Sequence, residues 1–86
     1  MANHESSKKR IRQTVKITER NKHVRSTTRT TIKRVRAAVE AKDKKAAQTA
    51  LSAAVKQIDK AVQKGVYPRA TGSRYISRLT SHVAGL

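Results

Sequence analysis

The first 36 residues of the chain carry twelve Lys or Arg side chains and only two acidic ones, Glu5 and Glu19. Twelve minus two gives this segment +10 of the chain's formal charge of +16. A segment this charged has too little apolar surface to offset the entropy lost when it becomes ordered. It cannot form the core of a fold, and we expect it to need a dense polyanion around it. Nucleic acid is the obvious candidate.

The kind of basic residue changes along the chain. Residues 1–36 mix seven Arg with five Lys, residues 37–64 use six Lys and no Arg, and residues 65–86 use three Arg and no Lys. Arg offers a planar fork that binds phosphate through two hydrogen bonds, whereas Lys is a strongly hydrated point charge. This division favours contact surfaces at both ends and a solvated middle, although chance or codon bias would produce the same pattern.

The composition predicts an all-α fold with a thin core. An 86-residue chain is one small domain that buries only roughly 60% of the surface its unfolded form exposes. Its apolar side chains include eight Val, five Ile and three Leu but no Phe or Trp. Twelve Ala supply much of the rest, and Ala is the best helix former while contributing little buried area. The absence of Cys excludes disulfides, thiolate metal sites and cysteine nucleophiles.

One long helix is expected first. Ser6 or Ser7 can cap its start, and neither Gly nor Pro occurs between them and Ala41. Its basic residues project in every direction, and a helix that is polar all round is unstable alone or wrapped by something else. We therefore expect residues 1–25 to be disordered or fraying in isolation and helical when bound. The apolar stripe of this helix is Ile17, Val24, Ile32, Val35 and Val39.

Two shorter helices follow. Asp43 is a good N-cap, residues 44–64 contain no breaker, and Gly65 stands where a left-handed C-cap belongs. Pro68 suits the first turn of a third helix, which Gly72 weakens by about 1 kcal/mol relative to Ala. The apolar face of the second helix is Ala47, Leu51, Ala54, Val55, Ile58 and Val62, and that of the third is Tyr75, Ile76, Leu79 and Val83.

These elements predict a three-helix bundle from which the long, basic first helix projects. The whole chain, residues 1–86, is then a single domain, with a basic extension at residues 1–31 and a bundle core at residues 32–86. The expected core residues are Ile32, Val35, Val39, Leu51, Val55, Ile58, Leu79 and Val83.

Catalytic and metal-binding chemistry finds no support. His4, His23 and His82 have no metal-ligand spacing, no two acids suggest general acid–base work, and no Ser lies in a nucleophile motif. We expect a non-enzymatic protein without metal, cofactor or small-molecule substrate. No apolar run approaches the roughly 20 residues of a membrane span, and no apolar stretch follows the basic N-terminus as in a secretory signal. We therefore expect a protein that acts in the cytoplasm, where it is made, and does not self-associate.

Two small clusters near the C-terminus bear on binding. Arg74 and Arg78 are four apart and share a helix face with Ser77, a spacing that fits a phosphate between them as well as it fits a solvated face. The Arg-only composition of this end of the chain favours the phosphate. Tyr67 and Tyr75 could stack on bases, but tyrosines that flank a helix junction more often fill the junction.

A series of short runs occurs in a characteristic order along nearly the whole chain: Met1-Ala2-Asn3, Ser6, Lys8-Lys9-Arg10-Ile11-Arg12-Gln13, Arg20-Asn21-Lys22, Arg25-Ser26, Arg29-Thr30, Ile32-Lys33, Ala46-Ala47, Asp59-Lys60-Ala61, Lys64-Gly65-Val66 and Ser77-Arg78-Leu79. In these runs the chain resembles the bacterial small-subunit ribosomal protein S20 family. The resemblance implies a three-helix bundle with a long basic first helix, which binds small-subunit ribosomal RNA directly and early in assembly. It implies contacts with the five-prime domain and the long penultimate stem, in the lower body of the subunit. Residues 67–73 depart from the family pattern, so no RNA contact is assigned to them.

The expected partners are small-subunit ribosomal RNA and the assembled small ribosomal subunit. A-form RNA is recognised through its phosphates and shape, which suits a helix that is basic on all sides. A helix that reads a DNA groove instead concentrates its basic residues on one face. A nucleoid-type DNA-compacting protein is the alternative. A membrane-active protein would need a basic helix with bulky Trp, Phe or Leu on its apolar face, and the first helix lacks these residues. The residues expected to bind RNA are Asn3, Ser6, Lys8, Lys9, Arg10, Arg12, Gln13, Lys16, Arg20, Asn21, Lys22, Arg25, Ser26, Arg29, Lys33, Arg34, Arg74, Ser77 and Arg78.

Overall fold

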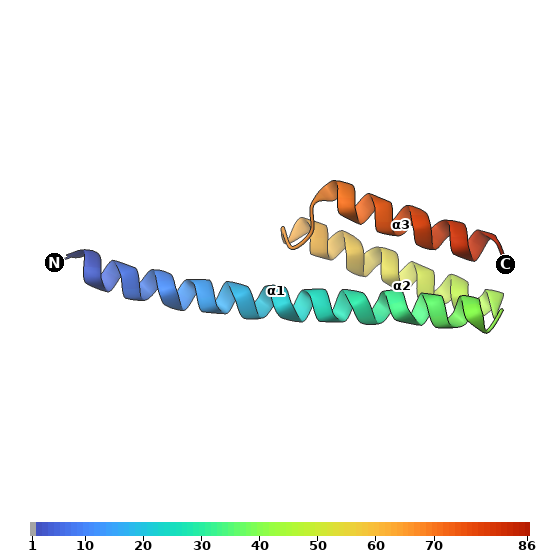
Figure 1. Ribbon diagram of the computed structural model, residues 1–86, viewed down its shortest axis with the longest axis horizontal. Coiled ribbons are helices and arrows are strands. Elements are labelled where there is room, and N and C mark those ends of the chain that lie inside the picture. Colours follow the sequence, from blue (N-terminus) through green and yellow to red (C-terminus); the bar gives the residue numbers. More distant parts are fainter. Residues whose placement is uncertain (1) are drawn as a thin grey trace.

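Three helices make up the computed structural model, which describes the backbone of residues 2–86 and the side chains of residues 6–86. They are α1 (Ala2–Glu40), α2 (Lys44–Gln63) and α3 (Arg69–Ala84). Each helix runs antiparallel to the one before it, so α1 and α3 point the same way and both end near the C-terminus (Figure 1). The predicted all-α, three-helix class is confirmed.

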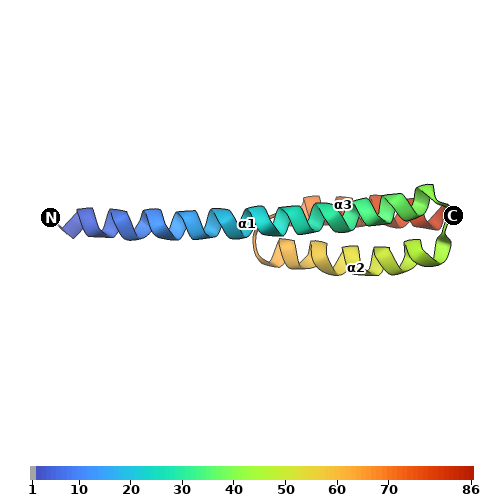
Figure 2. The same ribbon diagram turned by 90° about the horizontal axis from the view of Figure 1, so that it is seen from below.

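The molecule is elongated because α1 is about twice as long as its partners. A helix of 39 residues is about 58 Å long, and the molecule measures 63 × 21 × 14 Å. Its radius of gyration is 17.5 Å, against about 12 Å for a compact domain of this length. Helices α2 and α3 pack only on the C-terminal part of α1, and its N-terminal part projects away from them (Figures 1 and 2). The expected projecting first helix is confirmed.

The projecting segment, defined here as residues 6–20, has no buried side chain. Its apolar residues are open to solvent as well: Ile11 is 62% exposed and Ile17 is 49% exposed. Ile17, the first residue of the apolar stripe, stays unpacked because neither α2 nor α3 reaches that far along α1. Ser6 and Ser7 lie inside α1, which begins at Ala2, so the expected cap at either serine is wrong.

Among the described residues of α1, Val24 is the first buried side chain, and it is only 4% exposed. Val24 packs with Ala61 and Val66, the residues at the end of α2 and just beyond it, and Tyr67 covers this small cluster. One turn later Thr28 is fully buried, and its hydroxyl donates to the Val24 carbonyl at 2.8 Å. The Gln57 side-chain amide donates to the same hydroxyl at 3.4 Å. The bundle therefore starts well before residue 32, because the turn after α2 returns the chain to α1 at Val24.

The main core lies between the C-terminal half of α1 and the other two helices. Val35 and Ile58 are fully buried there, so the interpretation of both as core residues is confirmed. Two alanines of α2, Ala47 and Ala54, are also fully buried, and such small residues let the helix backbones approach closely. Leu79 and Val83 of α3 complete the buried set. Four expected core residues, Ile32, Val39, Leu51 and Val55, are only partly buried.

The two turns end their preceding helices in the same way. After α2, Gly65 has φ +75°, its N–H donates to the Val62 carbonyl, and the Val66 N–H donates to the Ala61 carbonyl at 2.9 Å. This is the Schellman pattern, and it confirms the predicted C-cap at Gly65. After α1 the same pattern places a lysine, Lys42, at φ 56°.

The starts of α2 and α3 differ. The Asp43 carboxylate accepts from the Ala46 N–H at 3.1 Å, which confirms the predicted N-cap of α2. Pro68 occupies the N-cap position of α3 and provides no side-chain cap, so it lies one residue earlier than expected. Gly72 is buried where α3 crosses α2, and a Cβ at this position would lie 2.5 Å from Val62 Cγ2. The glycine therefore permits the close crossing of α2 and α3.

Candidate nucleic-acid interface

The projecting segment presents positive charge around its whole circumference. It carries six basic residues and one acid, Glu19, and all its side chains are exposed. Successive residues of a helix are rotated by about 100°, so Lys8, Lys9 and Arg10 point in three different directions. The Thr14 hydroxyl donates to the Arg10 carbonyl at 2.9 Å, so its donor is used within the helix. The predicted contact residues in this segment are Ser6, Lys8, Lys9, Arg10, Arg12, Gln13, Lys16 and Arg20.

Along the bundle the basic residues of α1 gather on one face, which we call the basic stripe. Its residues recur at helical spacing and line a shallow hollow on the side of α1 turned away from Val24 and Val35. Thr30 again folds its hydroxyl onto the helix, against the Ser26 carbonyl at 3.0 Å. The stripe consists of Lys22, Arg25, Ser26, Arg29, Thr30 and Lys33, five of which are predicted contact residues.

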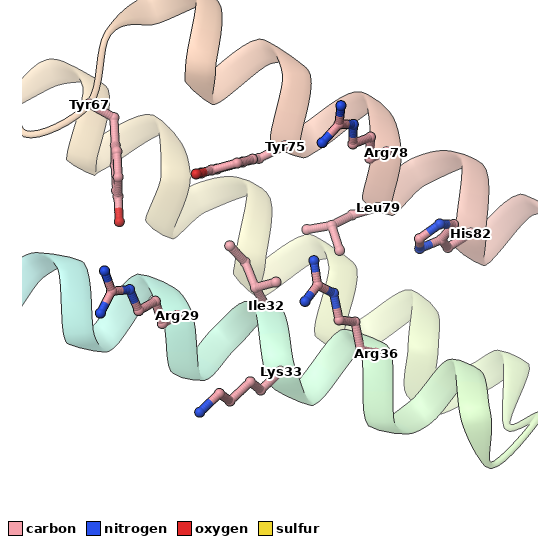
Figure 3. A pocket seen from close by; sticks show the side chains of 9 residues that line it. All are labelled: Arg29, Ile32, Lys33, Arg36, Tyr67, Tyr75, Arg78, Leu79 and His82. Atoms are coloured by element: carbon pink, nitrogen blue, oxygen red, sulfur yellow. The ribbon is translucent and has the colours of Figure 1, made fainter.

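A groove lies between α1 and α3, which contact each other less extensively than either contacts α2. It adjoins the stripe. The groove holds a hollow of about 390 Å³. Arg29 and Lys33 belong to both the stripe and the groove, so the two form one continuous surface. Figure 3 shows the side chains around the groove, which come from α1, from α3 and from the turn that precedes α3: Arg29, Ile32, Lys33 and Arg36 from α1, Tyr67 from the turn, and Tyr75, Arg78, Leu79 and His82 from α3.

Two tyrosines form one end of this groove. The rings of Tyr67 and Tyr75 meet edge to face, with centroids 5.9 Å apart and planes at 77°. Each also packs on a buried cluster, Tyr67 near Val24 and Tyr75 on the main core. The interpretation of both tyrosines as junction-filling residues is therefore confirmed. They remain only partly buried, and both line the groove.

Three predicted contact residues meet in the groove: Arg29, Lys33 and Arg78. Others lie elsewhere. Arg74 is placed over the Tyr75 ring, with its guanidinium carbon 5.9 Å from the centroid, in cation–π contact. Arg34 lies on the opposite flank of α1, in a hollow shared with α2.

Two further predicted contact residues, Ser77 and Asn21, lie outside both the groove and the basic stripe. Ser77 is exposed on α3. Asn21 is partly buried, and its Oδ1 has no hydrogen-bond partner among the described residues. The side chain of Asn3 lies outside the described residues.

Six residues of the groove are absent from the sequence-based contact list: Arg36, Tyr67, Tyr75 and His82, and the expected core residues Ile32 and Leu79. Arg36 is seven residues after Arg29 and four after Ile32, so helical spacing alone places all three on one face. His82 follows Arg78 by four residues on α3 in the same manner. The sequence spacing predicts each of these helix faces, but only the packing of α3 against α1 brings the two faces together.

Within the side chains described, residues 6–86, no group of three or more His, Asp or Glu side chains is arranged to hold a metal ion. Over the same part of the chain, no helix is both long and apolar enough to cross a membrane.

The fold and surface define a small, elongated and strongly basic three-helix protein. The family model for ribosomal protein S20 matches residues 2–84, and the chain belongs to that family, whose members are structural proteins and not enzymes. Similar proteins called small ribosomal subunit protein bS20 occur in Geotalea daltonii (60% identical) and Geobacter sulfurreducens (57% identical). Each alignment spans 83 residues, which is 96% of this chain and 95% of the relative. The resemblance drawn from the sequence is confirmed.

Proposed function

We propose that this chain is a structural component of the small ribosomal subunit that binds the subunit's RNA directly and helps it to assemble in the cytoplasm. Membership of the S20 family and the names of the relatives support the ribosomal part of the proposal. The observation that supports direct RNA binding is the projecting segment, about 22 Å of helix with cations on every side and with every side chain of residues 6–20 exposed.

A partner that surrounds this segment must supply negative charge from several directions. A crevice between packed RNA helices does so, because phosphates line each wall. Duplex DNA presents its phosphates to one face of a bound helix, and the cations on the far face would stay in solvent. The geometry therefore favours folded RNA over duplex DNA.

The contact residues divide by position into two groups with different roles. Those of the projecting segment, with Asn3 ahead of it, enter the RNA. Those of α1 beyond residue 20 and of α3 hold the bundle against the RNA surface, and hydroxyls such as that of Ser77 bind phosphate oxygens at close range. The second group comprises Asn21, Lys22, Arg25, Ser26, Arg29, Lys33, Arg34, Arg74, Ser77 and Arg78.

The test is binding of the purified chain to protein-free small-subunit RNA across a range of salt concentrations. If about eight phosphates are neutralised, log K falls with log salt with a slope of roughly −6 to −7. A slope shallower than about −2 would contradict the electrostatic account. Equal affinity for duplex DNA of matched length at about 0.15 M salt would favour the nucleoid-type alternative. In cell lysate, the tagged chain is expected to sediment with small subunits.

A further inference from the structure

The groove between α1 and α3 combines two surfaces that phosphate binding alone does not need. Its floor is aromatic and aliphatic, and its rim is cationic (Figure 3). A surface that binds only the phosphate backbone gains nothing from an exposed aromatic floor, because phosphates are strongly hydrated. The floor is Tyr67, Tyr75, Ile32 and Leu79, and the rim includes Arg29, Arg36, Arg78 and His82.

Tyr67 and Tyr75 are the only two large aromatic side chains of the chain, since it has no Phe and no Trp. Both lie in this one groove, and each keeps part of its surface open to solvent. Their edge-to-face contact, with centroids 5.9 Å apart, fixes the rings relative to each other. A fixed aromatic surface stacks with any nucleobase, whatever its sequence.

The rim arginines are spaced for a nucleotide lying along the groove. Arg29 and Arg36 are seven residues apart on α1, so their Cα atoms are separated by about 10.5 Å along the helix axis. Figure 3 shows Arg29 near the Tyr67 end and Arg36 pointing into the other half, with Arg78 above it on α3. Because each guanidinium binds phosphate with two hydrogen bonds, the rim can hold the phosphates on both sides of one base.

From these observations we infer that the groove holds one unpaired nucleotide extruded from the bound RNA. Its base lies on the Tyr67–Tyr75 pair and the aliphatic floor, and its flanking phosphates lie against Arg29, Arg36 and Arg78. The inference rests on the proposed function, since it supposes an RNA partner. Bases inside a duplex are already stacked on their neighbours, so the groove selects bulges and loops over paired stems.

The basic stripe explains how such a nucleotide reaches the groove. Arg29 and Lys33 line both surfaces, so an RNA strand that follows the stripe passes the mouth of the groove. Positive charge on the stripe holds the strand close, and the tyrosines then compete with stacking inside the RNA for one base.

The test uses ring signals of the two tyrosines in NMR spectra of the full chain, because these signals report on the groove alone. The probes are an RNA hairpin with one bulged adenosine, the same hairpin fully paired, and adenosine monophosphate, each at about 0.15 M salt. The bulged hairpin is expected to move both ring signals upfield through ring-current effects, and the paired hairpin and the mononucleotide are not.

Arg36→Ala and Arg34→Ala form a matched pair of variants: both residues are exposed arginines of α1, but only Arg36 lines the groove. Loss of the Arg36 contact is expected to weaken binding of the bulged hairpin about tenfold or more, relative to the Arg34 variant. Both should weaken binding of the paired hairpin equally.

Unshifted rings, equal shifts with the paired hairpin, or equal weakening by the two variants would overturn the inference. If wild-type binding to small-subunit RNA persists in that case, the proposed function stands without it. Saturation of the ring shifts by adenosine monophosphate alone would assign the groove to a free nucleotide and also overturn the inference. Failure of the wild type to bind small-subunit RNA would reject the proposed function. The ring shifts with the bulged hairpin would then decide alone whether the groove holds an unpaired nucleotide.

Discussion

The projecting segment and the bundle portion of α1 belong to one continuous helix, but they differ in what surrounds them. In the projecting segment even Ile11 is 62% exposed, whereas Val24 and Val35 in the bundle portion are 4% and 0% exposed. An isolated helix of about 15 residues is marginal in water, and most helix stability in proteins comes from packing. The difference teaches that the two halves are stabilised differently: α2 and α3 pack against the bundle portion, whereas the side chains of residues 6–20 are all exposed, and the proposed RNA partner would supply the contacts they lack.

Hydrogen exchange should give the largest contrast between the two halves. In the free protein, amides of the projecting segment are expected to exchange about 10³-fold or more faster than those at the centre of α2, if the bundle is stable by about 5 kcal/mol. Addition of small-subunit RNA should slow exchange in the projecting segment. Strong protection of residues 6–20 without RNA would break the comparison, because the segment would then fold without a partner.

RNA affinity offers the next contrast, between the arginine-bearing end of the chain and the lysine-bearing middle. Arg74→Ala with Arg78→Ala removes two charges, as does Lys56→Ala with Lys60→Ala, and all four side chains are exposed. Charge-assisted contacts contribute about 1.5–3 kcal/mol each, so the arginine variant should bind small-subunit RNA far more weakly. The lysine variant should lose only a screened, long-range contribution. Equal losses in a filter-binding assay at about 0.15 M salt would place α2 on the contact surface.

Matched isoleucines compare the two regions in stability. Ile58 is fully buried and Ile11 is mostly exposed. Ile58→Ala should lower the free energy of unfolding by about 2–5 kcal/mol, measured by urea denaturation followed by circular dichroism. Ile58→Val, at about 0.5–1.5 kcal/mol, serves as the milder variant if the alanine variant does not fold. Ile11→Ala should stay within about 0.5 kcal/mol of wild type. A larger loss at Ile11 would mean that the projecting segment has a packed partner within the chain.

Local signals made most of the bundle predictable. Asp43 and Gly65 mark the two ends of α2 because capping depends on a few neighbouring residues, and both predictions are confirmed. The point where packing on α1 begins was not predictable in this way. It depends on where Val66, 42 residues after Val24, returns to α1. That distance is set by the length and crossing of α2, which no local pattern contains.

The same distinction applies to the candidate site. The basic character of α1 and the helical spacing of its charges are readable from the sequence, and the basic stripe matches five predicted residues. The groove combines α1 with α3, so the sequence alone does not show that the two tyrosines and Arg36 line one surface. Gly72 was interpreted as a weak point of α3, but only the α2–α3 crossing reveals that its missing side chain makes room for Val62.

Gly72→Ala tests that crossing with a smaller expected effect. The added Cβ would lie 2.5 Å from Val62 Cγ2 and 3.4 Å from Ile58 Cγ2, and Val is stiff at χ1. Overpacking should cost about 1–3 kcal/mol, which outweighs the gain of about 1 kcal/mol in helix propensity. In the double variant Gly72→Ala with Val62→Ala the clash is removed. The double variant should therefore lose less unfolding free energy than the two single variants lose together. A more stable Gly72→Ala protein would show that the crossing has room for a methyl group.

The smallest expected effect concerns Lys42, which has φ 56° in the turn after α1. The left-handed region costs about 1–2 kcal/mol for a residue with a Cβ, and glycine avoids this cost. Glycine also raises the entropy of the unfolded chain by about 0.5–1 kcal/mol, so Lys42→Gly should stabilise the bundle by about 0.5–1 kcal/mol net. The backbone hydrogen bond from residue 42 to the Val39 carbonyl stays possible in the variant.

Two further glycine variants serve as controls for Lys42→Gly. Ala41→Gly, at a neighbouring position without positive φ, should destabilise the bundle by about 0.5–1 kcal/mol. Thr14→Gly, in the projecting segment, should change the free energy of unfolding by less than about 0.5 kcal/mol. The same substitution is thus expected to act with opposite signs at adjacent turn positions and to have almost no effect in the projecting segment. A loss at Thr14 as large as that at Ala41 would mean that α1 unfolds as one cooperative unit from end to end, and the division of this helix into two regions would be wrong.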